Sequence, residues 1–182
     1  MLERSPSAVL CAVSLLVLCV ETAAAIGEAP GMFRGDPAHT GSYDEQGLKS
    51  LTLKWRVATG GKVRSSPIVV GELVLVGRED GKLYAVDRGS GSVRWTHACE
   101  GPVTSSPASA GGTVFVVDGR GNLDALRLDS GKLLWTVAVG DPVPYEQRPG
   151  EPRNWDFYLS SPTVHHGTVL FGGADGQVYA VD

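Results

Sequence analysis

The chain has 182 residues, and its 16 basic and 20 acidic side chains give a formal net charge of −4. That charge excludes the basic surface that a nucleic-acid partner requires, and a hydrophobic fraction of 42% excludes wholesale disorder. With 24 glycines and only 20% charged residues, the composition predicts many short strands joined by tight turns rather than a helical protein.

Residues 1–25 are predicted to be a secretory signal peptide. The apolar run from Ala8 to Val20 has the length of the hydrophobic part of such a signal. It is too short for a membrane span, which needs about 20 residues. Small residues at Ala23 and Ala25 indicate cleavage after Ala25, and hence a secreted or periplasmic location.

Two alternatives to a cleaved signal stay open. Glu3 offsets the positive charge of Arg4, so the start is weakly basic and an uncleaved anchor is one alternative. Cys19 suggests a lipoprotein signal as the other, although Leu18 stands where such a signal has a small residue.

Cleavage after Ala25 would leave Cys99 as the one remaining cysteine, so no disulfide could form within the chain. We expect Cys99 to be a half-buried thiol at the end of a strand. Pairing with a second chain is the alternative.

A repeat of about 40 residues organises the rest of the sequence. Trp55, Trp95 and Trp135 follow one another at steps of 40 residues. A Ser-Ser-Pro triplet begins at positions 65, 105 and 160, so the third unit carries an insertion of 15 residues. Because many unrelated positions keep one register, we interpret the chain as a set of structural repeats.

Each repeat predicts four strands. In the first unit these cover residues 68–70, 73–77, 83–87 and 92–98, separated by turns rich in glycine. A four-stranded unit of this length, repeated, is typical of a β-propeller blade. We therefore predict an all-β fold, a β-propeller of four-stranded antiparallel blades.

The stretch Ala85-x-Asp87-x-x-x-Gly91-x-x-x-Trp95 resembles the repeat of pyrroloquinoline-quinone-type (PQQ-like) propellers, and residues 32–41 resemble the lead-in found before many of them. In the second unit Arg127 replaces the aspartate, so that turn is expected to be capped differently. The resemblance implies that the shared residues dock each blade onto the next. The residues assigned this structural role are Trp55, Trp95, Trp135, Ala85, Asp87, Gly91 and Gly131.

The propeller is predicted to be partial, with about three blades and a ring that is not closed, because closed rings have about four to eight blades. The missing blades would come from the rest of a longer chain or from other subunits, and an open stack is the alternative. The predicted divisions are a lead-in over 26–50, an outer strand over 51–59, blades over 65–98 and 105–138, an insertion over 141–159 and an incomplete blade over 160–182, with the repeat region as a whole spanning 51–182.

The insertion is the candidate binding loop because it occurs in one unit alone and is rich in aromatic and arginine side chains. A proline-rich flap that covers a blade edge is the alternative. The candidate binding residues are Tyr145, Glu146, Arg148, Arg153, Asn154, Trp155, Asp156 and Tyr158.

No catalytic or metal-binding residue is predicted. The pair His165-His166 falls at a turn, where neighbouring side chains point apart. The run Asp118-Gly119-Arg120-Gly121-Asn122 is a poor calcium loop because Arg120 occupies a ligand position. His39 and His97 have no visible partner in the sequence.

The resemblance also bears on function. Quinone-dependent dehydrogenases of this family use an adjacent cysteine pair and a calcium ion, whereas this chain keeps only Cys99 after cleavage, which argues against PQQ as a cofactor and against an enzyme. We predict a non-catalytic secreted propeller that acts as a binding or scaffold module for a protein or cell-envelope partner, similar to the family's outer-membrane assembly propellers. A fragment of a PQQ-dependent dehydrogenase and a sensor of a small ligand or polysaccharide are the alternatives.

Overall fold

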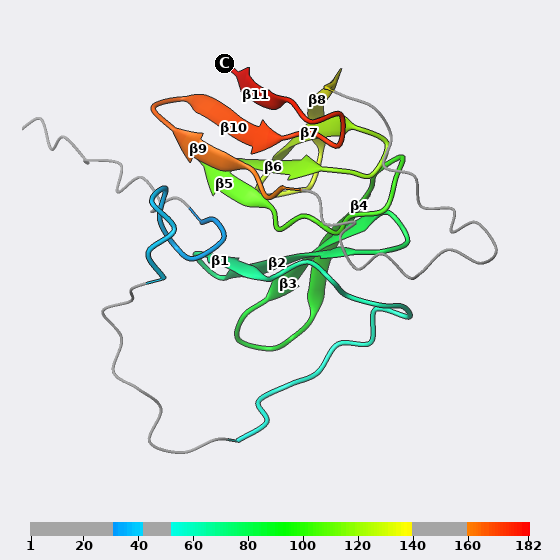
Figure 1. Cartoon of the computed structure of the whole chain (residues 1–182). Helices are drawn as coiled ribbons and strands as arrows, with labels where there is room; N and C mark the ends of the chain where they lie inside the picture. The colour runs from blue at the N-terminus through cyan, green and yellow to red at the C-terminus, as the bar shows by residue number, and fades with distance from the viewer. Residues whose placement is uncertain (1–30, 42–51, 140–159) are drawn as a thin grey trace, which may run out of the picture.

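The computed structural model describes residues 31–41, 52–139 and 160–182, and these residues form three antiparallel sheets (Figure 1). Among the residues described, none forms a helix long and apolar enough to cross a membrane. Blade 1 holds β1 (Ile68–Val70), β2 (Leu73–Arg78), β3 (Lys82–Asp87) and β4 (Val93–Ala98); blade 2 holds β5 (Ala108–Ala110), β6 (Thr113–Val117), β7 (Asn122–Arg127) and β8 (Leu133–Ala138); blade 3 holds β9 (Thr163–His165), β10 (Thr168–Gly172) and β11 (Val178–Val181).

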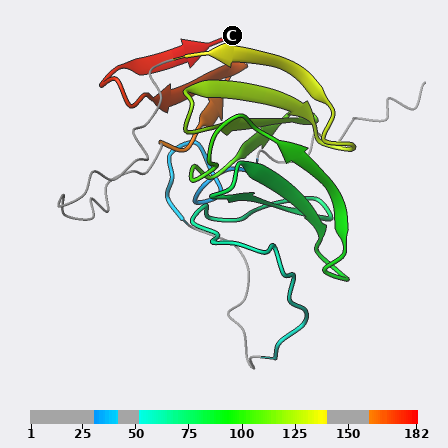
Figure 2. The ribbon, with the colours of Figure 1, turned by 90° about the vertical axis from the view of Figure 1, so that its right-hand side faces the viewer.

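The three sheets lie face to face, with blade 2 between blades 1 and 3 (Figures 1 and 2). Each sheet is a simple meander in which neighbouring strands are consecutive in the chain. The predicted all-β fold is confirmed, and the sheets form a partial propeller whose ring is not closed.

The repeat is reproduced down to single turns. Gly81, Gly121 and Gly176 occupy the same place in the three blades, each with a φ between 80° and 88°, which favours glycine. The ladder between the third and fourth strands shifts register at Ala85/Val86 in blade 1 and at Ala125/Leu126 in blade 2, again 40 residues apart. Local sequence therefore specifies the same twisted hairpins in each unit.

The outer strand predicted over residues 51–59 is wrong for the part that the structure describes, because residues 52–59 are not assigned to any strand. An outer strand needs the backbone of a third strand beside it; β3 and β7 pair with β4 and β8, and β11, the third strand of blade 3, pairs with β10 and with no other strand among the described residues. Trp55 nevertheless lies against blade 1, where its indole N–H donates to the carbonyl of Arg88 at 2.9 Å.

The hydrophobic core lies between the sheets rather than within any one of them. One cluster joins blades 1 and 2 and includes Leu75, Leu83 and Leu126, which are fully buried. A second joins blades 2 and 3 and includes Leu123 and Phe171. Since successive strand residues point to opposite faces, Leu123 and Leu126 serve different neighbours, and blade 2 is apolar on both faces.

Trp95 occupies the boundary between blades 1 and 2. Its ring is 9% exposed, and its indole N–H donates to the carbonyl of Leu128 at 2.9 Å. The ring lies on Gly131, where a Cβ atom would overlap it. Trp55 contacts Gly91 in the same way, whereas Trp135 on β8 is 37% exposed and contacts Phe115.

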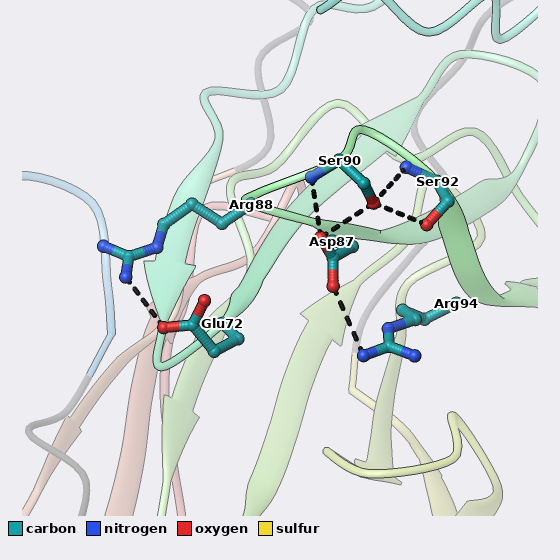
Figure 3. A network of polar contacts seen from close by, with 6 residues as sticks. All are labelled: Glu72, Asp87, Arg88, Ser90, Ser92 and Arg94. Carbon is teal, nitrogen blue, oxygen red and sulfur yellow. Dashed lines mark hydrogen bonds and ion pairs between the residues drawn. The ribbon is translucent and has the colours of Figure 1, made fainter. Parts of the chain in front are cut away.

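Asp87 closes the turn between β3 and β4, as Figure 3 shows. Its carboxylate accepts two hydrogen bonds from Ser90, both at 2.8 Å, which lower the pKa of Asp87, and it forms an ion pair with Arg94 at 3.3 Å. In blade 2 the turn is held differently, since Arg127 pairs with Asp129 and lowers the pKa of that carboxyl to about 2.

The Ser-Ser-Pro triplets form hydrogen bonds between and within blades. The backbone N–H of Ser66 donates to Oγ of Ser106 at 3.1 Å, and that of Ser106 donates to Oγ of Ser161 at 3.0 Å. Within blade 2, Oγ of Ser105 donates to the carbonyl of Val117 at 2.7 Å. These serines therefore link the inner strands of three successive blades.

The lead-in residues 31–41 lie beside the inner strands. Gly31 exchanges two backbone hydrogen bonds with Ser109 on β5, and Met32 is buried in the core between blades 2 and 3. Nε2 of His39 lies 2.8 Å from Oγ1 of Thr163 on β9. His39, for which the sequence suggested no partner, thus contacts blade 3.

We predict that Trp95→Ala lowers the free energy of unfolding by about 3–5 kcal/mol, because it empties a buried interblade contact and leaves the Leu128 carbonyl without its donor. Urea titration followed by far-ultraviolet circular dichroism measures the loss. Trp135→Ala is the matched control and should cost much less, since its ring is already partly exposed. Equal losses for the two variants would contradict the docking role of Trp95.

A second prediction separates backbone strain from crowding. Gly131 and Gly111 both have positive φ, 68° and 57°, so alanine at either costs about 1–2 kcal/mol. A Cβ on Gly131 would overlap the Trp95 ring, while a Cβ on Gly111 would meet nothing within 4 Å. Gly131→Ala should therefore be less stable than Gly111→Ala by a further ~1–3 kcal/mol in the same titration. Equal stability of the two variants would show that the indole moves aside freely.

Candidate functional site

The candidate binding loop lies outside the described residues, and with it Tyr145, Glu146, Arg148, Arg153, Asn154, Trp155, Asp156 and Tyr158. The described residues on either side are firmly held. Val139, at the end of blade 2, is buried and donates its N–H to the carbonyl of Gly121 at 2.7 Å. Pro162, at the start of blade 3, is fully buried. The segment is therefore attached to the packed blades at both ends.

A polar cluster that the sequence analysis did not single out lies between blades 1 and 2. His97 on β4 and Cys99 just beyond it face blade 2, and Asp124 on β7 faces blade 1. Nε2 of His97 is 2.9 Å from Oδ2 of Asp124, and Oγ1 of Thr136 donates to Oδ1 of Asp124 at 2.7 Å. The three chemically active groups lie within 4.8 Å of one another.

The fold places these side chains by simple periodicity. His97 and Cys99 are two residues apart, so they share one face of the extended chain. Asp124 shares its face of β7 with Leu126, which packs into the core between blades 1 and 2. The backbone N–H of Cys99 donates to the carbonyl of Gly81 at 2.7 Å, which fixes the end of the outer strand.

The electrostatics of the cluster keep Cys99 protonated. Burial, followed by the negative charges of Asp124 and Asp118, raises the pKa of the Cys99 thiol far above its usual value. Its hydrogen bond goes to Asp124 rather than to a base that would remove the proton. Residues of these three types form catalytic triads elsewhere, but here the thiol is not activated as a nucleophile.

The expectation that His97 has no partner is wrong. The side chains of His97 and Asp124 are 13% and 8% exposed, so the pair is almost removed from water. The two residues are 27 positions apart and belong to different blades, which hid the pairing. When the repeats are aligned, Asp124 stands where the other units have Tyr84 and Tyr179. This difference could have marked position 124 as unusual from the sequence alone.

The run from Asp118 to Asn122 forms a turn. The carboxylate of Asp118 accepts backbone hydrogen bonds from Gly101, Arg120 and Asn122 at 2.9–3.1 Å. Its oxygens are thus already engaged by the protein and do not offer a calcium site.

The histidine pair lies where a turn was predicted. His165 ends β9, and His166 enters the following turn with a φ of 49°.

The residues described also do not fit a bound quinone with its calcium ion. Cys99 is the one cysteine among them, so an adjacent cysteine pair is lacking there, and the buried carboxylate of Asp118 is satisfied by backbone N–H groups. These observations match neither group of the quinone site that the resemblance implied.

Solved structures similar to this chain include an assembly factor and quinone enzymes. BamB from Moraxella catarrhalis is 25% identical with a TM-score of 0.57, and the match covers 72% of this chain and 38% of that one. A europium-containing methanol dehydrogenase is 23% identical with a TM-score of 0.57, covering 72% and 25%. The quinohemoprotein alcohol dehydrogenase ADHIIG from Pseudomonas putida HK5 is 20% identical with a TM-score of 0.53, covering 70% and 20%.

No curated protein sequence matches the chain. The two dehydrogenases, below 25% identity, support the propeller fold alone. The chain spans 38% of the length of the similar BamB, so the activity of a whole propeller is not carried over. The family model described as outer membrane protein assembly factor BamB matches residues 49–182, which confirms the resemblance to PQQ-like repeats. This chain belongs to that family of PQQ-like repeat propellers.

Proposed function

We propose that the protein is a non-catalytic propeller of the secreted or periplasmic space that binds a protein or cell-envelope partner, in a role similar to that of BamB. The observation that carries this proposal is the match of residues 49–182 to the BamB family model. The similarity to BamB from Moraxella catarrhalis supports it. Export would follow from the predicted signal peptide over residues 1–25.

The chemistry of the described residues favours binding over catalysis. The thiol of Cys99 is partly buried, and its desolvation together with the charges of Asp124 and Asp118 raises its pKa, which favours the protonated form. Ser66, Ser106 and Ser161 each stand two residues before the first strand of a blade, and the hydroxyls of Ser106 and Ser161 accept hydrogen bonds between blades. Polar groups here hold the scaffold together, which is the arrangement expected of a module that works through its loops.

The proposed contact surface is the insertion over residues 141–159. Its aromatic and arginine side chains are of the types that anchor protein interfaces. Val139 and Pro162, close to its two ends, are buried, so the packed blades fix the points between which the loop runs.

We predict that replacing Tyr145, Arg148, Arg153 and Trp155 together by alanine reduces assembly of outer-membrane β-barrel proteins without unfolding the propeller. The measurement is the folded fraction of those barrels, read from heat-modifiable gel mobility, in cells that lack the encoding gene and carry the wild-type or variant copy. The matched control is Lys132→Ala, an exposed residue in a turn of blade 2. Full barrel assembly in the absence of the gene would refute the proposed function. Full assembly with the four-alanine variant would refute the role of the loop alone.

A separate experiment tests the proposal that the protein is not an enzyme. Purified protein mixed with PQQ and Ca²⁺ should leave the absorbance spectrum of the quinone unchanged, because the described residues supply neither a cysteine pair nor a free buried carboxylate at Asp118. It should also not reduce a dye acceptor when alcohols are added. A saturable spectral change coupled to dye reduction would favour the dehydrogenase alternative.

A further inference from the structure

Equivalent positions can be compared at the two interblade boundaries and at the contact of blade 1 with residues 52–59. Where blade 1 meets residues 52–59, the hydroxyl of Tyr84 approaches the carbonyl of Thr59 at 3.3 Å. Where blade 3 meets blade 2, Tyr179 and Val139 belong to the same hydrophobic cluster. By the steps of 40 and 55 residues, the middle boundary places Cys99 and Asp124 at these positions. The third difference at this boundary is His97, which stands where the neighbouring units have Val57 and Val137.

Three of the differences at the middle boundary introduce metal-ligand types. Valine, threonine and tyrosine give way to histidine, cysteine and aspartate, and the fold then brings the three substituted side chains together within 4.8 Å. The backbone is unchanged, since Cys99 and Val139 both donate to the carbonyl of an equivalent glycine at 2.7 Å. The difference therefore lies in the side chains alone.

We propose that His97, Cys99 and Asp124 form a binding site for a divalent transition-metal ion, with Zn²⁺ as the best match. The nitrogen, sulfur and oxygen donors are those that Zn²⁺ takes, whereas Ca²⁺ and Mg²⁺ prefer oxygen alone. This site is independent of the proposed partner binding.

The geometry needs only a small adjustment. With metal–ligand bonds of about 2.0–2.3 Å, donors around a tetrahedral ion lie roughly 3.3–3.8 Å apart. Nε2 of His97 and Oδ2 of Asp124 are now 2.9 Å apart, so side-chain rotation opens enough space. Thr136 already donates to the other oxygen of Asp124, which holds the carboxylate in orientation as outer partners of metal ligands do.

The charges also balance. Binding releases the proton of the Cys99 thiol, and the thiolate and the Asp124 carboxylate together neutralise the two positive charges of the ion while His97 binds as the neutral imidazole. The fourth position is left to water, because the carboxylate of Asp118, a further acid whose charge acts on Cys99, is engaged by backbone N–H groups. Because two ligands come from blade 1 and one from blade 2, the bound ion would link the two blades.

The test is a titration of the chelator-treated, reduced protein with Co²⁺, followed by Zn²⁺. Co²⁺ should produce a thiolate charge-transfer absorption, and excess Zn²⁺ should remove it and raise the melting temperature. Cys99→Ser should abolish the charge-transfer band, and Asp124→Asn should weaken Zn²⁺ binding by at least tenfold. Thr136→Val should keep the band while weakening binding about tenfold, as expected of a positioning residue.

The neighbouring boundaries supply variants that are expected to fold. Cys99→Val and Asp124→Tyr place at the middle boundary the residue types found at positions 139 and 179. Both should lose the Zn²⁺-dependent rise in melting temperature, whereas His165→Ala, a histidine at a distant turn, should keep it. Absence of a charge-transfer band in the folded wild-type protein, or its survival in Cys99→Ser, would overturn the proposal.

Discussion

Each sheet in this protein depends on the sheet beside it. A four-stranded sheet that is apolar on both faces cannot exclude water alone, and the two hydrophobic clusters accordingly lie between blades. Trp95 shows this dependence most clearly. Its indole covers Gly131 and donates a hydrogen bond to the carbonyl of Leu128, both on the neighbouring blade. The glycine is required twice, for its positive φ and for the space that the ring occupies. The stability of each blade therefore depends on the blade packed beside it.

That dependence explains which features were predictable from the sequence. Glycine turns, alternating strands and the 40-residue step are local signals, and they placed β1 to β4 almost to the residue. The strand expected over residues 51–59 failed because pairing depends on a distant partner that local sequence does not report. The contact of His97 with Asp124 was missed for the same reason, since it joins two blades. The binding residues of the insertion lie outside the described structure and stay a prediction.

Repetition supplies a way to separate scaffold from site. A residue type that recurs in each unit, such as the serines that link Ser66, Ser106 and Ser161, serves the stacking of blades. A departure from the repeat at a buried boundary needs its own reason. A buried polar pair costs desolvation that an apolar contact would avoid, so His97 and Asp124 gain little stability over the valine and tyrosine found elsewhere. A metal ion that binds only the folded boundary would add the stability that the pair itself does not provide.

The same propeller fold occurs in an assembly factor and in quinone enzymes, so the fold does not decide between them. The polar groups of the described residues bear on the proposal of a binding role. In the described part of the chain, the carboxylate of Asp118 is held by backbone N–H groups and Cys99 is kept protonated. The inserted segment occurs in one unit alone, and Val139 and Pro162 close to its ends are buried; because loops displayed on a packed repeat scaffold often carry function, this segment is the surface we propose for binding.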